Sequence, residues 1–135
     1  MDYAMNTLNN GKHLLLVDDE EAIIFALKRV LRRPRVTIDT AGTLEDAKSC
    51  LDTAEYDALV ADMRLTGSGS MEGFEIVAYA RNHQDHCKIL VITAFGDDEI
   101  REKVFNLGAD VYLEKPVSPR TVSDMLESIG VFSKV

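Results

Sequence analysis

Short apolar runs along the chain end abruptly at polar residues. Residues 14–17, 58–61 and 89–92 are such runs, and residues 109–113 form a similar strand-like segment. Continuous apolar runs of this length are typical of strands that are buried on both faces of a parallel sheet. Residues 36–40 add a shorter strand, so the pattern predicts five strands in all.

Between these runs, apolar residues recur at the spacing of a helix. The first helical stretch, residues 20–33, begins with acidic and ends with basic residues, as suits the helix dipole, and Pro34 stops it. The other four helices are expected at residues 43–52, 73–82, 97–107 and 119–129. Thr43 and Ser118 are suited to begin helices, and Gly108 is suited to end one.

Strands that alternate with helices along a chain predict an α/β fold. Right-handed crossovers then place helices on both faces of one parallel sheet. In open sheets of this kind, ligands bind beyond the carboxyl ends of the strands. The residues that directly follow the strands are therefore the first candidates for a functional site.

Polar residues with matching chemistry follow four of the predicted strands. They are Asp18 and Asp19 after the first, Asp62 after the third, Thr93 after the fourth and Lys115 after the fifth. Clustered carboxylates raise one another's pKa unless a cation joins them, and an all-oxygen cluster suits a hard ion such as Mg²⁺. A lysine beside it can hold a phosphoryl group. Each residue alone also fits a helix cap, a strand end or a surface side chain, but the set favours a site.

An Asp-Asp pair, a strand-ending Asp, Thr-Ala and Lys-Pro, each after an apolar strand, together resemble the receiver domain of bacterial two-component response regulators. The resemblance runs from about His13 to Ile129. It implies a doubly wound, flavodoxin-like sheet of five parallel strands in the order 2-1-3-4-5 with five helices. The expected division is a flexible lead-in at residues 1–11, a receiver domain at 12–130 and a C-terminal tail at 131–135.

The resemblance also implies a reaction. Asp62 would accept a phosphoryl group from a phosphohistidine of a sensor histidine kinase, or of a phosphotransfer protein, with Mg²⁺ as cofactor. Asp19 and Asp62 would bind the Mg²⁺ directly, and Asp18 would bind it through water. The main-chain carbonyl of Arg64 would supply another ligand.

Lys115 and Thr93 are implied to contact the phosphoryl oxygens, the first by its charge and the second by its hydroxyl group. The peptide bond between Lys115 and Pro116 is expected to be cis, which would aim the lysine into the site. These two side chains would join Asp62 in the catalytic set of a domain that catalyses only its own phosphorylation and dephosphorylation.

Further residues would set the lifetime and the output of the phosphorylated state. Arg64 and Phe95 lie two residues beyond Asp62 and Thr93, where bulk would obstruct the water that hydrolyses the acyl phosphate. Thr93 and Tyr112 resemble a switch pair, and Tyr112 would face the fourth helix. Phosphorylation would then remodel the surface of the fourth helix, fifth strand and fifth helix. The simpler interpretation of Tyr112 is a packed strand aromatic.

Related functions fit the residues less well. A flavodoxin-like electron carrier needs a phosphate loop after the first strand, where this chain has four carboxylates at residues 18–21. A phosphatase of the haloacid-dehalogenase type carries a second acid two residues after its nucleophile, where this chain has Arg64. A degenerate receiver that only binds partners would lack part of the site, and here the set is intact.

Two other segments suggest sites at first sight. Residues 66–73 are rich in Gly and Ser but lack the lysine of a P-loop, so the part from Gly67 to Ser70 is expected to be a mobile surface loop. Residues 83–87 contain two histidines and a cysteine, but no matching ligand group occurs elsewhere. A polar connection is the expected role of that segment.

The composition and net charge limit the kinds of partner that the chain is expected to bind. The chain has 135 residues, enough for one domain, and a net charge of −8, which repels phosphate backbones and disfavours direct nucleic-acid binding. No apolar stretch reaches membrane-spanning length, and the first residues lack a signal-peptide pattern, so a cytoplasmic protein that does not bind membranes is expected. The expected partners are the kinase or phosphotransfer protein, an effector that the sequence does not identify, and a second copy of the chain.

Overall fold

The computed structural model describes residues 11–64, 72–94 and 96–133. In this part of the chain, five parallel strands form one sheet in the order β2-β1-β3-β4-β5, as predicted. The strands are β1 (Lys12–Val17), β2 (Val36–Ala41), β3 (Ala58–Asp62), β4 (Lys88–Thr93) and β5 (Val111–Glu114). The helices are α2 (Glu21–Leu31), α3 (Leu44–Thr53), α4 (Glu72–His83), α5 (Asp98–Leu107) and α6 (Pro119–Ser128).

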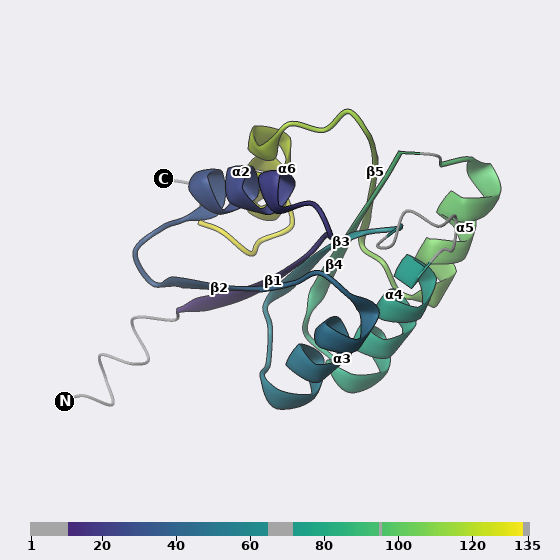
Figure 1. The fold of residues 1–135 in the computed structure, drawn as a ribbon, viewed down its shortest axis with the longest axis horizontal. Coiled ribbons are helices and arrows are strands. Elements are labelled where there is room, and N and C mark those ends of the chain that lie inside the picture. The colour runs from purple at the N-terminus through teal and green to yellow at the C-terminus, as the bar shows by residue number, and fades with distance from the viewer. Residues whose placement is uncertain (1–10, 65–71, 95, 134–135) are drawn as a thin grey trace.

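The helices cover both faces of the sheet. Figure 1 shows α2 and α6 on one face and α3, α4 and α5 on the other. Successive residues of β1 point to opposite faces, so Leu14 and Leu16 pack with α2 and α6 while Leu15 and Val17 pack with the other three helices. Because both of their faces are buried, the central strands β1, β3 and β4 appear in the sequence as continuous apolar runs rather than as alternating ones.

Local hydrogen bonds begin and end the helices where the sequence predicts. The Thr43 side chain accepts a hydrogen bond of 3.0 Å from the Asp46 main-chain N–H at the start of α3. The Ser118 hydroxyl accepts one of 3.1 Å from the Thr121 main-chain N–H at the start of α6. Gly108 ends α5 in the left-handed conformation, with a φ of 119°.

The first helix differs from its predicted form. It spans Glu21–Leu31 rather than residues 20–33, because Arg32 already has an extended backbone, with a ψ of 128°. Its apolar face is also wider than the stripe that packs on the sheet. Leu27 and Leu31 are buried, whereas Ile23 is 36% exposed and Val30 is 38% exposed. Apolar periodicity therefore predicts that the helix exists but overestimates the apolar area that the helix buries.

The predicted tail begins as part of the packed domain. Val131 and Phe132 are each 4% exposed and belong to the core on the α2 and α6 side. The Arg33 guanidinium lies 3.9 Å from the centre of the Phe132 ring, so the end of the described chain is held against the C-terminal end of α2. In the described ranges, no helix has the length and the apolar composition needed to cross a bilayer.

Candidate functional site

Strand register brings the predicted site residues to one edge of the sheet. Val17 of β1 lies opposite Ala61 of β3, so Asp18, which follows β1, and Asp62, the last residue of β3, lie at the same level. On the other side of β3, Asp62 lies opposite Ile92 of β4, and Thr93 is the next residue of that strand. This edge lies at the topological switch point, where β1 and β3 are neighbours and their crossover connections run to opposite sides.

The Asp62 carboxylate is nearly buried and has a partner for each oxygen. Its Oδ2 atom lies 3.3 Å from the Lys115 Nζ atom. Its Oδ1 atom accepts a hydrogen bond of 3.3 Å from the Arg64 main-chain N–H. Asp62 is 7% exposed, so the lysine charge acts on it with less screening by water than at an open surface. A carboxyl group is thus held beside a lysine side chain at the open edge of the sheet.

Three consecutive acids gather beside this pair. Carboxylate oxygens of Asp18, Asp19 and Glu20 lie within 4.8 Å of one another. The Glu20 main-chain N–H donates a 2.9 Å hydrogen bond to Asp18 Oδ1, which ties the turn together. Glu20 was expected to serve the start of the first helix. It occupies the N-cap position of α2, but its side chain makes no capping hydrogen bond and belongs to the acidic group instead.

The acidic group carries unbalanced negative charge. Burial raises the pKa of the Asp18 carboxyl from 3.8 to about 6. The hydrogen bond from the Glu20 N–H lowers this pKa, the charge of Asp62 raises it, and the charge of Lys115 lowers it again. A cluster that offers only carboxylate oxygens is a donor set that a hard divalent ion fits. Two of the predicted metal ligands, Asp18 and Asp19, thus belong to a group of oxygen donors that suits a divalent ion. Asp62, which was also predicted, is not one of the three clustered acids.

The remaining predicted residues occupy β4 and β5. Thr93, at the end of β4, is 1% exposed, and its main-chain oxygen accepts a 2.8 Å hydrogen bond from the Lys115 N–H. The peptide bond between Lys115 and Pro116 is cis, as the resemblance implied. Tyr112 packs on the face that carries α5, with its ring centre 6.4 Å from that of Phe105. The predicted orientation of Tyr112 is therefore confirmed.

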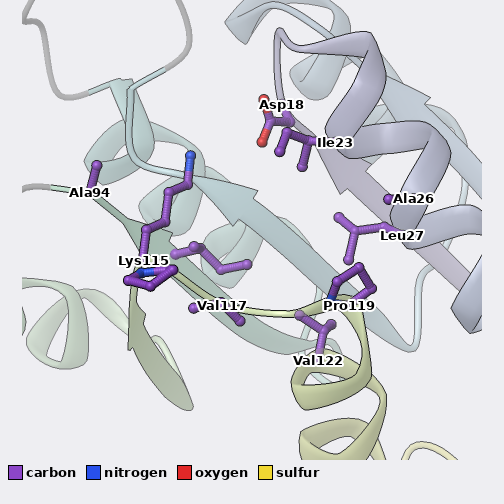
Figure 2. A pocket seen from close by; sticks show the side chains of 11 residues that line it. Asp18, Ile23, Ala26, Leu27, Ala94, Lys115, Val117, Pro119 and Val122 are labelled. Carbon is purple, nitrogen blue, oxygen red and sulfur yellow. The ribbon is translucent and has the colours of Figure 1, made fainter.

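A groove of about 540 Å³ opens beside the acidic group. Its walls are mainly apolar, from Ile23 and Leu27 of α2 on one side and from Pro119 and Val122 at the start of α6 on the other. Figure 2 shows the Asp18 side chain and the Lys115 side chain extending toward the same end of this groove. A partner that reaches Asp62 from this side meets an apolar surface that ends at the charged edge.

The described structure does not place some of the residues singled out in the sequence at this site. Phe95 and the loop from Gly67 to Ser70 lie outside the described residues. The segment of two histidines and a cysteine begins at His83, the last residue of α4, and continues as the connection to β4 at residues 84–87. Within it, burial raises the pKa of the Cys87 thiol to about 12, with the charge of Arg81 acting in the opposite direction, which disfavours a thiolate ligand there.

Comparison with known proteins identifies the fold and its family. A family model described as the response regulator receiver domain matches residues 14–127. The chain belongs to this family. The receiver domain is 36% identical over 121 residues to the alkaline phosphatase synthesis transcriptional regulatory protein PhoP of Bacillus subtilis, covering 88% of this chain and 48% of PhoP. It is 35% identical over 107 residues to the transcriptional regulatory protein TcrA of Mycobacterium tuberculosis, covering 79% of this chain and 41% of TcrA. The chain thus spans less than half the length of these curated relatives.

Solved structures share the architecture. A CheY-like response regulator receiver domain protein from Methanospirillum hungatei JF-1 has a TM-score of 0.80 and 26% identity, covering 89% of this chain and 94% of that one. A response regulator from Burkholderia pseudomallei, crystallised with a phosphorylated aspartic acid, a calcium ion and citrate, has a TM-score of 0.74 and 23% identity. It covers 92% of this receiver domain and 76% of its own chain, and at that identity it shows the shared fold.

Proposed function

We propose that this receiver domain accepts a phosphoryl group on Asp62 from a phosphohistidine of a sensor histidine kinase or a phosphotransfer protein, in a reaction that requires Mg²⁺. The observation that carries the proposal is the Asp62 carboxylate, 7% exposed at the carboxyl edge of the sheet, with the Lys115 Nζ atom at 3.3 Å and the acidic group next to it. A nucleophile, a cation and a set of oxygen donors are the parts that phosphoryl transfer to a carboxylate needs.

The transfer exchanges one bond at phosphorus for another. A carboxylate oxygen of Asp62 forms a bond to phosphorus while the bond between phosphorus and the donor imidazole nitrogen breaks, and the nitrogen keeps that electron pair. Lys115, now paired with Asp62, turns its charge to a phosphoryl oxygen as the acyl phosphate forms. The Thr93 hydroxyl donates a hydrogen bond to another oxygen. Positioning and charge neutralisation supply the catalysis.

The residues proposed to hold Mg²⁺ are Asp18, Asp19, Asp62 and the main-chain carbonyl of Arg64. The ion would supply positive charge opposite the phosphoryl oxygens. Support comes from the oxygen-only donor set of the acidic group and from the raised pKa of Asp18, which burial causes. Calcium in the Burkholderia pseudomallei protein belongs to another response regulator of the same fold, and it is likewise a hard divalent ion.

Intact-mass spectrometry with acetyl phosphate as the donor tests the phosphoacceptor. We expect wild type to gain one phosphoryl group in Mg²⁺ and none in EDTA, and Asp62→Asn to remain unlabelled. Asp85→Asn is the matched control, because Asp85 is exposed in the connection between α4 and β4 and should leave labelling unchanged. Full labelling of Asp62→Asn would contradict the assignment.

The lifetime of the phosphorylated state is proposed to depend on Arg64 and Phe95. Arg64 follows Asp62 by two residues, and its main-chain N–H already contacts the carboxylate at 3.3 Å. By sequence position, Arg64 and Phe95 lie two residues beyond Asp62 and Thr93, and bulk at these positions should obstruct the in-line water. The double variant Arg64→Ala/Phe95→Ala should therefore lose its phosphoryl group faster than wild type after removal of the donor. Equal hydrolysis rates would refute this role.

The proposed output is a change in the surface made by α5, β5 and α6. A phosphoryl group adds about two negative charges and strong acceptor oxygens, which would draw the Thr93 hydroxyl and let the Tyr112 ring turn inward. Charged side chains on that surface would then meet an effector domain, a separate effector protein or a second copy of the chain. Candidate contacts are Arg101, Glu114 and Arg120. Lys103, which was also a candidate, lies on the other side of α5, with its Nζ atom 4.1 Å from the centre of the Phe74 ring of α4.

Amide hydrogen exchange with and without beryllofluoride, a phosphoryl mimic, tests this switch. We expect changed exchange at residues 97–120 as well as around Asp62. Exchange that changes only in the segments next to Asp62 would reject the switch without contradicting phosphorylation of Asp62. The proposed phosphorylation and the proposed switch can therefore fail separately.

A further inference from the structure

The hydroxyl end of Tyr112 occupies the space beside Gly96. Gly96 lies on the connection between β4 and α5, and a Cβ atom built on it would be 1.6 Å from Tyr112 Oη and 2.8 Å from Tyr112 Cζ. It would also be 2.8 Å from the Glu114 Oε2 atom. Any residue other than glycine at this position would collide with the tyrosine as it now lies.

The collision is with side chains and not with the backbone. Among the described glycines, Gly108 and Gly130 have a positive φ, and Gly96 does not. Its backbone would therefore accept alanine without strain. What requires glycine at this position is the tyrosine ring, which is held there by its packing near Phe105 and by a 3.4 Å hydrogen bond from its hydroxyl to Glu114.

Gly96 also connects the two halves of the proposed switch. It follows Thr93 by three residues and precedes Asp97, whose side chain caps α5 by accepting a 2.8 Å hydrogen bond from the Ile100 N–H. A movement of Thr93 toward a phosphoryl group would shift this short connection against the tyrosine hydroxyl. The contact between Gly96 and Tyr112 thus lies between the end of β4 and the surface of α5.

We propose that Gly96 is a positioning residue of the switch: its missing side chain admits the Tyr112 hydroxyl in the resting state. This rests on the proposed function, because it takes Thr93 and Tyr112 as the switch pair. A methyl group at Gly96 destabilises the resting position of the ring and favours the state that vacates it. By linkage, any change that disfavours the resting state raises the affinity for a ligand of the other state by the same factor.

Beryllofluoride binding in Mg²⁺, followed by amide NMR titration, measures this effect. Overpacking by one methyl group is large enough that Gly96→Ala should bind beryllofluoride about fivefold more tightly than wild type. In protein labelled with fluorotyrosine, the Tyr112 signal of ligand-free Gly96→Ala should shift toward the position that it has in the bound wild type. In a Tyr112→Ala background, Gly96→Ala should change the affinity by less than about twofold.

Gly42→Ala is the matched control, since it adds the same methyl group where the nearest atom, the Asp18 main-chain oxygen, is 3.8 Å away. It should leave the affinity within about twofold of wild type. An unchanged or weaker affinity in Gly96→Ala would overturn the inference. So would displacement of the ring into the neighbouring cavity lined by Asp97 and Arg101 without a gain in affinity.

Two outcomes distinguish a failure of this inference from a failure of the proposed function. A wild type that does not bind beryllofluoride would reject the proposed function itself. If Gly96→Ala alone fails to fold, the double variant with Tyr112→Ala decides. Recovery of folding places the conflict at this pair and supports the inference, whereas failure of both variants refutes it.

Discussion

Neutralising Asp18 should stabilise the metal-free receiver domain at neutral pH. The change is Asp18→Asn, which keeps the size of the side chain and an oxygen for the 2.9 Å hydrogen bond from the Glu20 N–H. Asp18 is 8% exposed and lies near Asp62 and the other two acids, so its charge is held where water solvates it poorly. The amide removes that charge while the turn keeps its shape.

The magnitude follows from the two pKa values. Burial raises the pKa of Asp18 to about 6 in the folded protein, against 3.8 in the unfolded chain. Between these values the folded state binds more protons than the unfolded state, so the free energy of unfolding falls as the pH rises from about 4 to about 6. The difference corresponds to at most about 3 kcal/mol. We expect Asp18→Asn to gain about 1–3 kcal/mol over wild type at pH 7 and little at pH 4.

Urea unfolding in EDTA, repeated from pH 4 to pH 7.5, measures the difference between the two proteins. Asp19→Asn is the control, because Asp19 is exposed and its neutralisation should change stability by less than about 0.5 kcal/mol. Adding Mg²⁺ should stabilise wild type more than Asp18→Asn, since the variant lacks a proposed ligand. A variant that is no more stable than wild type at pH 7, or a difference that does not depend on pH, would refute this reasoning.

Two further predictions concern the core. Leu90→Ala, at a side chain that is 0% exposed in β4, should lower the free energy of unfolding by about 2–5 kcal/mol in urea denaturation, while Lys88→Ala on the same strand should change it little; equal effects would contradict the burial of Leu90. The Cys87 thiol, 1% exposed with its pKa raised to about 12 by burial, should react with a thiol reagent at pH 8 only after unfolding. Rapid labelling of Cys87 in the native protein would show that this part of the core opens.

The amino-acid pattern by itself determined the α/β class and the elements of the fold, while the strand order came from the family resemblance. Apolar runs gave β1, β3 and β4, because a strand covered on both faces is apolar at nearly every position, whereas β2 and β5 at the edges of the sheet have a more mixed pattern. Caps at Thr43, Ser118 and Gly108 were predictable because each depends on hydrogen bonds within one turn of chain. Asp18 and Asp62 could be placed at one edge, because parallel strands end together and both acids lie where an apolar run ends.

The tertiary structure alone decided which atoms meet at that edge. The Asp62 carboxylate pairs with Lys115, which is 53 residues away. Glu20 is the N-cap residue of α2, at the predicted start of the helix, and the structure adds that its carboxylate lies with those of Asp18 and Asp19. These outcomes depend on side-chain directions that distant packing sets, and a periodic pattern has no information about them.

The depth at which individual side chains are buried was also decided by the tertiary structure alone. Ile23 and Val30 belong to the apolar face of α2 by spacing, yet both remain more than a third exposed, because the sheet and α6 cover only part of that helix. The raised pKa of Asp18 and the fit of the Tyr112 hydroxyl against Gly96 likewise come from segments far apart in the chain. Periodicity determines which face of an element turns inward, whereas the depth of each residue depends on the neighbours that the whole fold brings to it.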